Sequence, residues 1–358
     1  MNKFHLILPP LYLCNLFFTK VKEKGGENIN NLEIALKSCP NNIVIFDSFV
    51  KTDATIPNYK KVLVAVSGGS DSDIVVDLFT KLFSPNDIEW VWYDTGIEYQ
   101  ATKDHLTFLE NKYNIQIKRV KAIKPIPVSC KEYGQPFINK YVSEMIYRLQ
   151  KHNFKFEDKP FDELLAIYPH CKVALLWWCN LNGEGSSFNI NHNKGLKEFL
   201  VKNPPEFKIS NMCCQYAKKK VAHKYASNNN IDLNVVGVRR SEGGIRSVAY
   251  TTCLSNGSVS EYRPIFWYRN ADKQEYNAHY QVVNSICYSG YGMSRTGCAG
   301  CPFAKDFEEE LKIIQEHEPK LYQAVINIFG DSYEYSRKYK EYIKQNSKSN
   351  RITLFDFM

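Results

Sequence analysis

Two kinds of hydrophobic pattern alternate in the first half of the chain. Continuous apolar runs rich in β-branched residues are typical of strands that are buried on both faces of a parallel sheet. Apolar residues spaced three and four apart predict amphipathic helices. The five segments, in the order strand, helix, strand, helix, strand, are 61–66, 73–83, 88–96, 100–114 and 115–123. This alternation predicts an α/β fold with a doubly wound, mostly parallel sheet.

The pattern changes in the middle of the chain, at about residues 123–205. Segments 141–151 and 161–168 have helical spacing, and loops rich in Asn, Gly and Pro separate them. We therefore expect a helical insertion in this region. The strand pattern returns at residues 231–240, and the end of the chain, rich in Lys, Tyr and Glu, is predicted to be helical.

The composition is that of an ordinary globular protein. The 358 residues are 44% hydrophobic and 23% charged, which excludes a wholly disordered chain, a collagen-like chain and a coiled-coil rod. The formal net charge of +8 favours an anionic partner such as a nucleotide or a nucleic acid.

An apolar segment near the N-terminus, residues 4–18, resembles the hydrophobic part of a secretion signal. It contains Pro9, Pro10 and Asn15, and no small-residue cleavage site follows it. We therefore interpret it as part of an N-terminal arm. No later apolar run reaches the length of about 18 residues that a membrane span needs, so we expect a cytoplasmic protein that does not cross a membrane.

The segment SGGSDS, residues 67–72, lies between the first predicted strand and the first predicted helix. Gly68 and Gly69 allow a tight turn and a close approach to a ligand, and the N–H groups at a helix N-terminus bind anions. The three serines add hydroxyl donors, and Asp71 either orients the loop or helps to hold Mg²⁺. The Gly-Lys-Ser/Thr ending of a Walker loop is missing. In this strand-helix context, a phosphate-binding loop is a better interpretation than a plain Ser/Gly turn.

Four of the eleven cysteines form two groups. Cys213 and Cys214 are adjacent, and Cys298 and Cys301 form a Cys-x-x-Cys pair. Four thiolates suit an iron–sulfur cluster or a zinc ion. Adjacent cysteines fit a cubane more easily than one tetrahedral ion, because neighbouring residues can reach different irons. We therefore predict a [4Fe–4S] cluster as the metal cofactor, with zinc and four metal-free thiols as the alternatives.

Several segments resemble a known family. SGGSDS after KVLVAV resembles the PP-loop of the adenine nucleotide α-hydrolase superfamily, whose members bind ATP or an adenylyl sulfate and react at the α-phosphate. Successive motifs of the phosphoadenosine-phosphosulfate (PAPS) reductase family resemble WVWYDTGIEY, EYGQPFINKYVSEMI, VVGVRRSEGGIRS, RPIFW and YGMSRTGCAGCPF. The resemblance covers about residues 60–305.

The resemblance implies a set of functional residues. The two cysteine groups resemble the cluster ligands of adenylyl-sulfate (APS) reductases and of DNA-phosphorothioation sulfurtransferases. Arg239 is expected at the anionic end of the nucleotide, because an Arg fork matches phosphate. Asp94 is expected at the ribose or base, or as a cap of the next helix. The full set expected at the nucleotide is Ser67, Gly68, Gly69, Ser70, Asp71, Ser72, Asp94, Arg239 and Arg246.

The chain departs from the family at one catalytic position. Sulfonucleotide reductases use a nucleophilic cysteine in a Glu-Cys-Gly-x-x-His motif near the C-terminus, and no cysteine follows Cys301 here. Nothing in the sequence marks Cys130, Cys171, Cys179 or Cys253 as a substitute. The loop SGGSDS is also closer to PP-loops that cleave ATP. We therefore expect an enzyme that cleaves ATP to AMP and pyrophosphate.

In this hypothesis a substrate oxygen is adenylated, the loop and Mg²⁺ neutralise the departing pyrophosphate, and sulfur then displaces AMP. The expected catalytic residues are Asp71, Ser72 and Arg239, and the expected partners are an adenine nucleotide and a sulfur-donor protein such as a cysteine desulfurase. A nucleic-acid substrate fits the charge, with Trp177 and Trp178 as stacking surfaces, although burial in the core is the stronger interpretation of these tryptophans.

Two alternatives stay open: an APS/PAPS reductase with an unrecognised thiol, and a nucleotide- or redox-sensing module without turnover. For the domain organisation, we expect an N-terminal arm over residues 1–55. A PP-loop nucleotide-binding α/β domain follows over residues 56–260 and contains the helical insertion. Residues 261–358 form a C-terminal helical segment that carries the second cysteine pair.

Overall fold

The computed structural model describes residues 31–243 and 250–349. These residues form two compact units, which are described separately below. The first unit comprises the described residues of Met1–Tyr93, Gln100–Val120 and Val221–Gly297. The second comprises those of Asp94–Tyr99, Lys121–Lys220 and Cys298–Met358. The expected boundaries near residues 55 and 260 stay a prediction.

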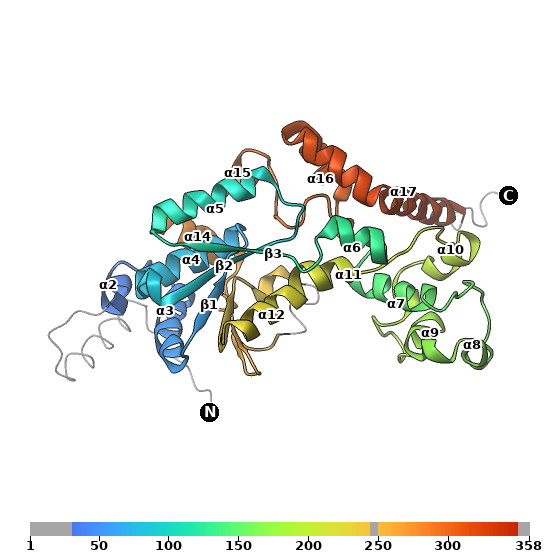
Figure 1. The fold of residues 1–358 in the computed structure, drawn as a ribbon, viewed down its shortest axis with the longest axis horizontal. Helices are drawn as coiled ribbons and strands as arrows, with labels where there is room; N and C mark the ends of the chain where they lie inside the picture. Colours follow the sequence, from blue (N-terminus) through green and yellow to red (C-terminus); the bar gives the residue numbers. More distant parts are fainter. Residues whose placement is uncertain (1–30, 244–249, 350–358) are drawn as a thin grey trace, which may run out of the picture. The chain divides into compact units, whose positions relative to one another are not determined.

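A six-stranded sheet organises the first unit (Figure 1). Its strands are β1 (Val62–Ala65), β2 (Ile88–Asp94), β3 (Ile117–Lys121), β4 (Leu233–Val236), β5 (Leu254–Ser255) and β6 (Ser260–Tyr262). The strand order is β3-β2-β1-β4-β6-β5. Strand β1 is parallel to both β2 and β4, and β4 is parallel to β6, whereas β5 runs antiparallel to β6. The prediction of an α/β fold with a mostly parallel sheet is confirmed.

Helices cover both faces of this sheet. They are α2 (Asn31–Lys37), α3 (Ile43–Thr55), α4 (Ser70–Leu82), α5 (Gln100–Tyr113), α12 (Lys220–Asn228), α14 (Asn270–Tyr280) and α15 (Ile286–Ser289). Successive side chains of a strand point to opposite faces. Val62 and Val64 of β1 accordingly pack with residues of α2, α3, α4 and α14, while Leu63 packs with Ala226 of α12. The doubly wound arrangement follows from this two-sided burial.

Residues that precede β1 belong to the same core. Leu32 and Leu36 of α2 and Ile45 and Phe49 of α3 are buried in the cluster that contains α4. Asn42 caps α3 through its side-chain oxygen, which accepts the backbone N–H groups two and three residues further along the chain. The helices before the sheet thus complete its hydrophobic layer.

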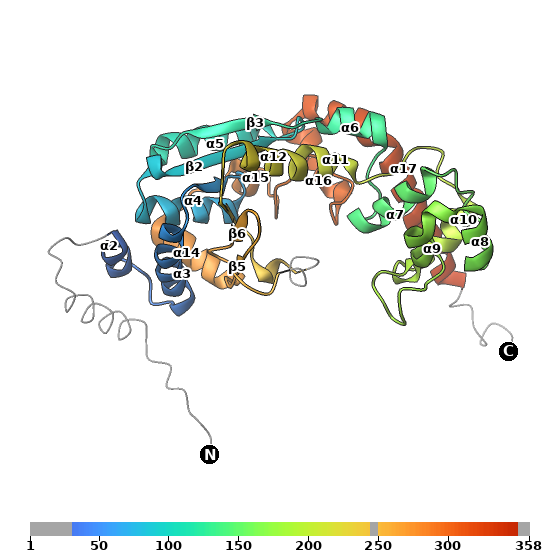
Figure 2. The ribbon, with the colours of Figure 1, turned by 60° about the horizontal axis from the view of Figure 1, so that its bottom comes forward.

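The second unit is built of helices (Figure 2). They are α6 (Ile126–Tyr133), α7 (Lys140–Gln150), α8 (Phe161–Ile167), α9 (Lys172–Trp178), α10 (Leu196–Lys202), α11 (Met212–Cys214), α16 (Phe307–His317) and α17 (Pro319–Ser349). Trp177 and Trp178 are fully buried in its aromatic core. The core interpretation of these tryptophans is therefore right, and a role as stacking surfaces is wrong. Among the described residues, no helix combines the length and the apolar character that crossing a bilayer requires.

Candidate functional site

Serine hydroxyls hold the turn that joins β1 to α4. The Ser67 N–H donates to the Ser72 hydroxyl at 2.9 Å, and the Gly69 N–H donates to the Ser67 hydroxyl at 3.3 Å. Gly68 has φ +69°, and a Cβ at this position would lie 2.9 Å from Cγ2 of Thr102. Only glycine meets both conditions without strain. The sequence therefore dictates a tight turn directly before a 13-residue helix.

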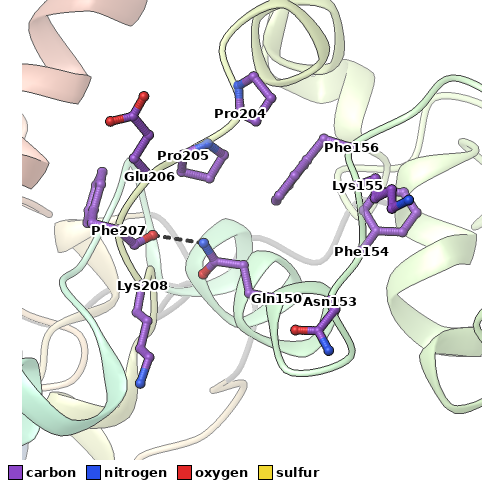
Figure 3. A pocket seen from close by; sticks show the side chains of 10 residues that line it. All are labelled: Gln150, Asn153, Phe154, Lys155, Phe156, Pro204, Pro205, Glu206, Phe207 and Lys208. Atoms are coloured by element: carbon purple, nitrogen blue, oxygen red, sulfur yellow. Dashed lines mark hydrogen bonds between the residues drawn. The ribbon is translucent and has the colours of Figure 1, made fainter.

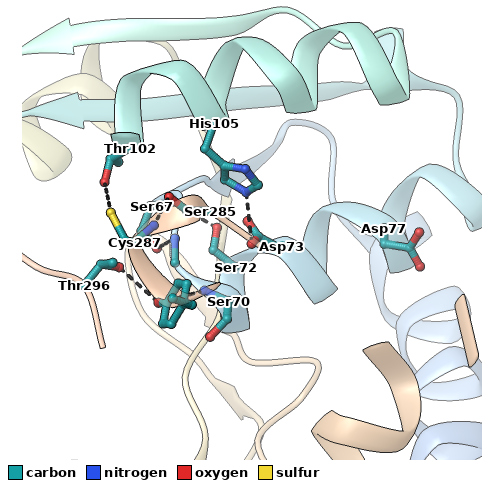
Figure 4. Close-up of polar contacts among 12 residues, drawn as sticks. Ser67, Ser70, Ser72, Asp73, Asp77, Thr102, His105, Ser285, Cys287 and Thr296 are labelled. Atoms are coloured by element: carbon teal, nitrogen blue, oxygen red, sulfur yellow. Dashed lines mark hydrogen bonds and ion pairs between the residues drawn. The ribbon is translucent and has the colours of Figure 1, made fainter. Parts of the chain in front are cut away.

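The first N–H of α4 is already hydrogen-bonded within the protein. The Ser70 N–H donates to the Tyr288 hydroxyl at 3.0 Å, and that hydroxyl lies 3.1 Å from the Thr296 hydroxyl. Figure 4 shows Ser70 and Thr296 on either side of this contact. Helix N-termini leave such N–H groups for anions or capping oxygens. The phenol oxygen of Tyr288 therefore acts as a capping oxygen at this helix N-terminus.

Two cations converge on the Asp71 carboxylate in the first turn of α4. Arg239 Nε lies 2.9 Å from Asp71 Oδ2, and Lys273 Nζ lies 2.7 Å from Asp71 Oδ1. Arg239 is buried and also donates to the side-chain oxygens of Ser241 and Asn270, both at 3.0 Å. Asp71 thus holds the guanidinium beside the loop, and its expected role in orienting the loop or holding Mg²⁺ stays a prediction.

The end of β4 comes directly against the start of α4. A Cβ on Gly237 would lie 3.0 Å from the backbone of Asp71 and Ser72, so a larger residue would push strand and helix apart. This close approach brings Arg239, two residues further on, to the loop. Sequence analysis found Arg239 because of its place after a buried strand, but it missed Lys273.

A buried contact between a histidine and a carboxyl group lies beneath the loop. His105 Nε2 of α5 is 3.1 Å from Asp73 Oδ2 of α4, and their side chains are 4% and 0% exposed (Figure 4). Burial raises the pKa of Asp73, and the contact with His105 opposes that rise. Sequence analysis assigned no role to any histidine. The contact joins α4 to α5 beneath the loop.

The remaining nucleotide-site predictions have separate outcomes. Asp94 is the last residue of β2, and its carboxylate accepts the Gly96 N–H at 2.8 Å, so it fixes the turn that follows the strand. Its assignment to a ribose or base stays a prediction. Arg246 lies outside the described residues.

The four grouped cysteines meet in the second unit. One small cavity of about 10 Å³ is lined by Cys213, Cys214, Cys298 and Cys301, and its other lining residues are Ile126, Pro136, Ala217, Lys218 and Phe329. The adjacent pair lies in α11, and the Cys-x-x-Cys pair lies in the loop before α16. Residues that are far apart in the chain are therefore gathered at one place.

Burial makes these thiols poor acids. A hydrogen bond with Cys130 raises the pKa of Cys213, and loss of hydration raises the pKa of Cys298 and of Cys301. The ammonium of Lys218 lies within hydrogen-bonding reach of Cys298, and attraction to that sulfur raises the pKa of Lys218. Without a metal the site favours neutral thiols, whereas a bound cation would favour thiolates.

Four thiols at one place are a ligand set for a [4Fe–4S] cluster or for a zinc ion. Tetrahedral zinc needs sulfurs about 3.8 Å apart around one centre, as its bond length of about 2.3 Å requires. Among residues 31–243 and 250–349, no group of three His, Cys, Asp or Glu side chains is arranged to hold a metal ion. The backbone supports this site with a π-helical turn, Gln215–Lys219, directly after Cys214.

A separate cavity of about 330 Å³ lies elsewhere in the second unit (Figure 3). Phe154, Phe156 and Phe207 line it, and the Gln150 side chain donates to the Phe207 carbonyl at 2.8 Å across its wall. None of the residues that sequence analysis selected lines this cavity. We assign it no function.

The first unit therefore defines an α/β protein whose serine- and glycine-rich turn presents a helix N-terminus beside two cations. Residues 61–156 match the model of the phosphoadenosine phosphosulfate reductase domain. The resemblance to this family is thus confirmed over that segment, which includes the loop. The segment covers β1 to α7 and leaves both cysteine groups outside.

One curated relative matches a longer segment. It is an uncharacterized protein of Methanocaldococcus jannaschii, 30% identical over 170 residues. The match covers 42% of this chain and 33% of the relative. The chain thus spans about a third of the length of the relative that it matches.

Solved structures of three enzymes are similar at low scores. A phosphoadenylyl-sulfate (PAPS) reductase of Candida auris in complex with phosphate has TM-score 0.42 at 10% identity. The match covers 76% of this chain and 98% of the reductase chain. An NH3-dependent NAD synthetase of Campylobacter jejuni has TM-score 0.34 at 12% identity, and the match covers 82% of this chain and 95% of the synthetase chain. A U34-tRNA thiolase of Methanococcus maripaludis with its [4Fe–4S] cluster has TM-score 0.32 at 13% identity, and the match covers 83% of this chain and 79% of the thiolase chain. Scores this low do not establish a shared fold, so the fold class rests on the strand order and directions of this chain.

Proposed function

We propose that this chain is a PP-loop enzyme that cleaves ATP to AMP and pyrophosphate and thereby activates a substrate for sulfur transfer. The observation that carries the proposal is the start of α4, where the SGGSDS turn, a helix N-terminus and the buried Arg239 come together. The match of residues 61–156 to the PAPS reductase domain supports an adenine nucleotide as the ligand.

In the proposed reaction a substrate oxygen attacks the α-phosphorus of ATP. A bond forms between that oxygen and phosphorus, the bond to the bridging oxygen breaks, and pyrophosphate leaves with the electron pair. Backbone N–H groups of the loop and the Arg239 guanidinium would neutralise the developing negative charge. Asp71 would hold the guanidinium in place, and Ser72 would keep the turn closed. Mg²⁺ would accompany the triphosphate. A sulfur nucleophile then displaces AMP from the substrate.

We further propose that Cys213, Cys214, Cys298 and Cys301 hold a [4Fe–4S] cluster, because their thiols line one cavity. When bound, such a cluster supplies irons to which a sulfur atom can attach. Purification without oxygen, followed by iron, sulfide and zinc analysis, tests this part. We expect a brown protein with iron and acid-labile sulfide. A colourless protein that contains zinc would contradict it.

Pyrophosphate release from ATP, with RNA and DNA as acceptors, tests the reaction. We expect release by the wild type, and its loss in Asp71→Ala and in Ser72→Ala. Asp47→Ala is the matched control, because Asp47 lies on α3 in an exposed ion pair with Lys51. Unchanged release in Asp71→Ala and Ser72→Ala would contradict the placement of the site.

Sulfite release from APS and PAPS is measured in parallel. Sulfite formation without pyrophosphate would replace the proposal by a sulfonucleotide reductase. Two of the candidate thiols are poorly suited to that alternative, because burial raises the pKa of Cys171 and of Cys179 and so disfavours the thiolate that attacks sulfur. Tight nucleotide binding without either product would instead indicate a sensing module.

A further inference from the structure

The phosphate-binding loop contains no cation of its own. Residues 67–72 read SGGSDS, and the only charged residue among them is Asp71. A nucleoside triphosphate carries several negative charges, and a carboxylate at the loop would repel it. Phosphate loops commonly place a lysine against the phosphates for this reason. A cation from another part of the chain would have to take that role here.

Lys273 of α14 places its ammonium on the loop. Lys273 Nζ donates to the Ser70 hydroxyl and lies 2.7 Å from Asp71 Oδ1. Ser70 is the first residue of α4, so the ammonium stands at the positive end of the helix dipole. The Lys273 side chain is 20% exposed. The charge is thus partly shielded from water but open to a ligand.

Two cations share the Asp71 carboxylate. Asp71 supplies one negative charge, whereas Arg239 and Lys273 supply two positive charges at 2.9 and 2.7 Å. Asp73, in the same turn of α4, is buried against His105 and also interacts with Lys273. The two cations thus stand beside two carboxyl groups, at a helix N-terminus whose N–H groups favour anions. An anion at the loop would share these cations with Asp71, and the ion pairs with Asp71 would keep both cations in position before it binds.

A lysine at the other end of the same helix shows what a purely structural ion pair looks like. Lys81 contacts both oxygens of Asp77 at 2.8 Å. Asp77 is buried and also accepts the hydroxyls of Tyr113 and Tyr276. One cation there meets one carboxylate, and that carboxylate has further donors. The pair lies near the C-terminus of α4, where anions are disfavoured.

We propose that Lys273 is the phosphate-binding cation of the SGGSDS loop. Its amine contacts the phosphates next to Ser70, while Asp71 and Arg239 hold the surrounding charges in place. This inference rests on the proposed function, because it concerns the same nucleotide site. It adds a residue that no motif marks. The loop would supply N–H groups to the phosphates, and a residue 203 positions from Ser70 would supply the positive charge.

Calorimetric titration of the full chain with pyrophosphate, at low and high salt, tests the proposal. We expect Lys273→Met to weaken binding about tenfold to a hundredfold, as the loss of a charge-assisted hydrogen bond predicts. The salt dependence of binding should also become shallower, because one contact between charges is lost. Lys273→Arg should retain most of the affinity. Lys81→Met is the matched control and should bind pyrophosphate like the wild type.

A relocation variant distinguishes binding from a structural role. Because the amine rests on the Ser70 hydroxyl, Ser70→Lys combined with Lys273→Ala moves the charge onto the loop itself. We expect this double variant to recover part of the affinity that Lys273→Ala loses. Should Lys273→Met fail to fold, Asp71→Asn/Lys273→Met removes both partners of the ion pair, and we expect it to bind weakly as well.

Three outcomes would overturn the inference. The first is wild-type affinity in Lys273→Met, or in the Asp71→Asn/Lys273→Met variant. The second is an equal loss of affinity in Lys81→Met. The third is a wild-type protein that binds neither pyrophosphate nor ATP, which would remove the proposed function together with the role of Lys273. A wild type that binds, beside a Lys273→Met variant that binds equally well, would remove the role of Lys273 alone.

Discussion

Replacement of Gly68 by alanine adds one methyl group to the turn before α4, and the structure divides its effect into two terms. The φ of +69° lies in the left-handed region, which is unfavourable by about 1–2 kcal/mol for an L-residue. The new Cβ would lie 2.9 Å from Cγ2 of Thr102, inside the usual carbon–carbon contact of about 3.5–4.0 Å. Such overpacking is unfavourable by about 1–3 kcal/mol. We expect the free energy of unfolding of the first unit to fall by about 2–5 kcal/mol.

Two further variants separate these terms. Gly292 lies in the same unit with φ +72°, and a Cβ there would meet no described atom within 4 Å. Gly292→Ala therefore measures the backbone term alone. Thr102→Ser removes Cγ2 but keeps the hydroxyl, which faces Cys287 Sγ at 3.9 Å. In Gly68→Ala/Thr102→Ser the overpacking should vanish, so the two changes should couple favourably by about 1–3 kcal/mol.

Urea unfolding followed by hydrogen exchange of peptides from α4 measures these effects. The exchange signal reports on the first unit alone, and a chain of two units need not unfold in one step. If Gly68→Ala and Gly292→Ala lose the same stability, the contact with Thr102 contributes nothing. If the double variant is only as stable as the sum of the single changes, the clash that we describe is absent.

Three further changes have expected outcomes. Burial raises the pKa of Asp73 above its unfolded value, so the first unit should lose stability as pH rises above about 3.9; Asp73→Asn should flatten this dependence in urea unfolding, and an unaltered slope would contradict it. Tyr333→Phe removes a buried hydrogen bond to the Gly300 carbonyl and should lower stability by about 1–3 kcal/mol, seen as faster hydrogen exchange around Gly300. Tyr288→Phe frees the Ser70 N–H and should tighten pyrophosphate binding, whereas weaker binding would mean that the hydroxyl itself contacts the anion.

The central strands and helices could be predicted because their patterns are strong. The run at residues 61–66 became β1, and the spacing at 73–83 became most of α4. A continuous apolar run indicates a strand that is buried on both faces, and apolar residues at helical spacing indicate a helix that is buried on one face. The antiparallel β5 and β6 were not predicted, because strands of two and three residues are too short to show an alternation.

The candidate site was predictable only where residues are neighbours in the chain. The SGGSDS turn and the two cysteine groups are local patterns, and Arg239 follows a recognisable strand. Lys273 lies in a polar helical segment without a motif, 203 positions from Ser70. The His105–Asp73 pair likewise depends on the packing of α5 against α4. Such partners become visible only when the packing of the helices is known.

The π-helical turn after the adjacent cysteines makes the length of that segment critical. A π-turn holds one residue more than the helix around it. Deletion of a single codon within residues 215–219 would let a regular helix run through to Asn228 and would rotate Cys213 and Cys214 by about 100° relative to the residues that follow. The two thiols would then turn away from their partners in the Cys-x-x-Cys loop. A substitution of the exposed Lys219 should be tolerated, whereas the loss of one residue from this segment should not.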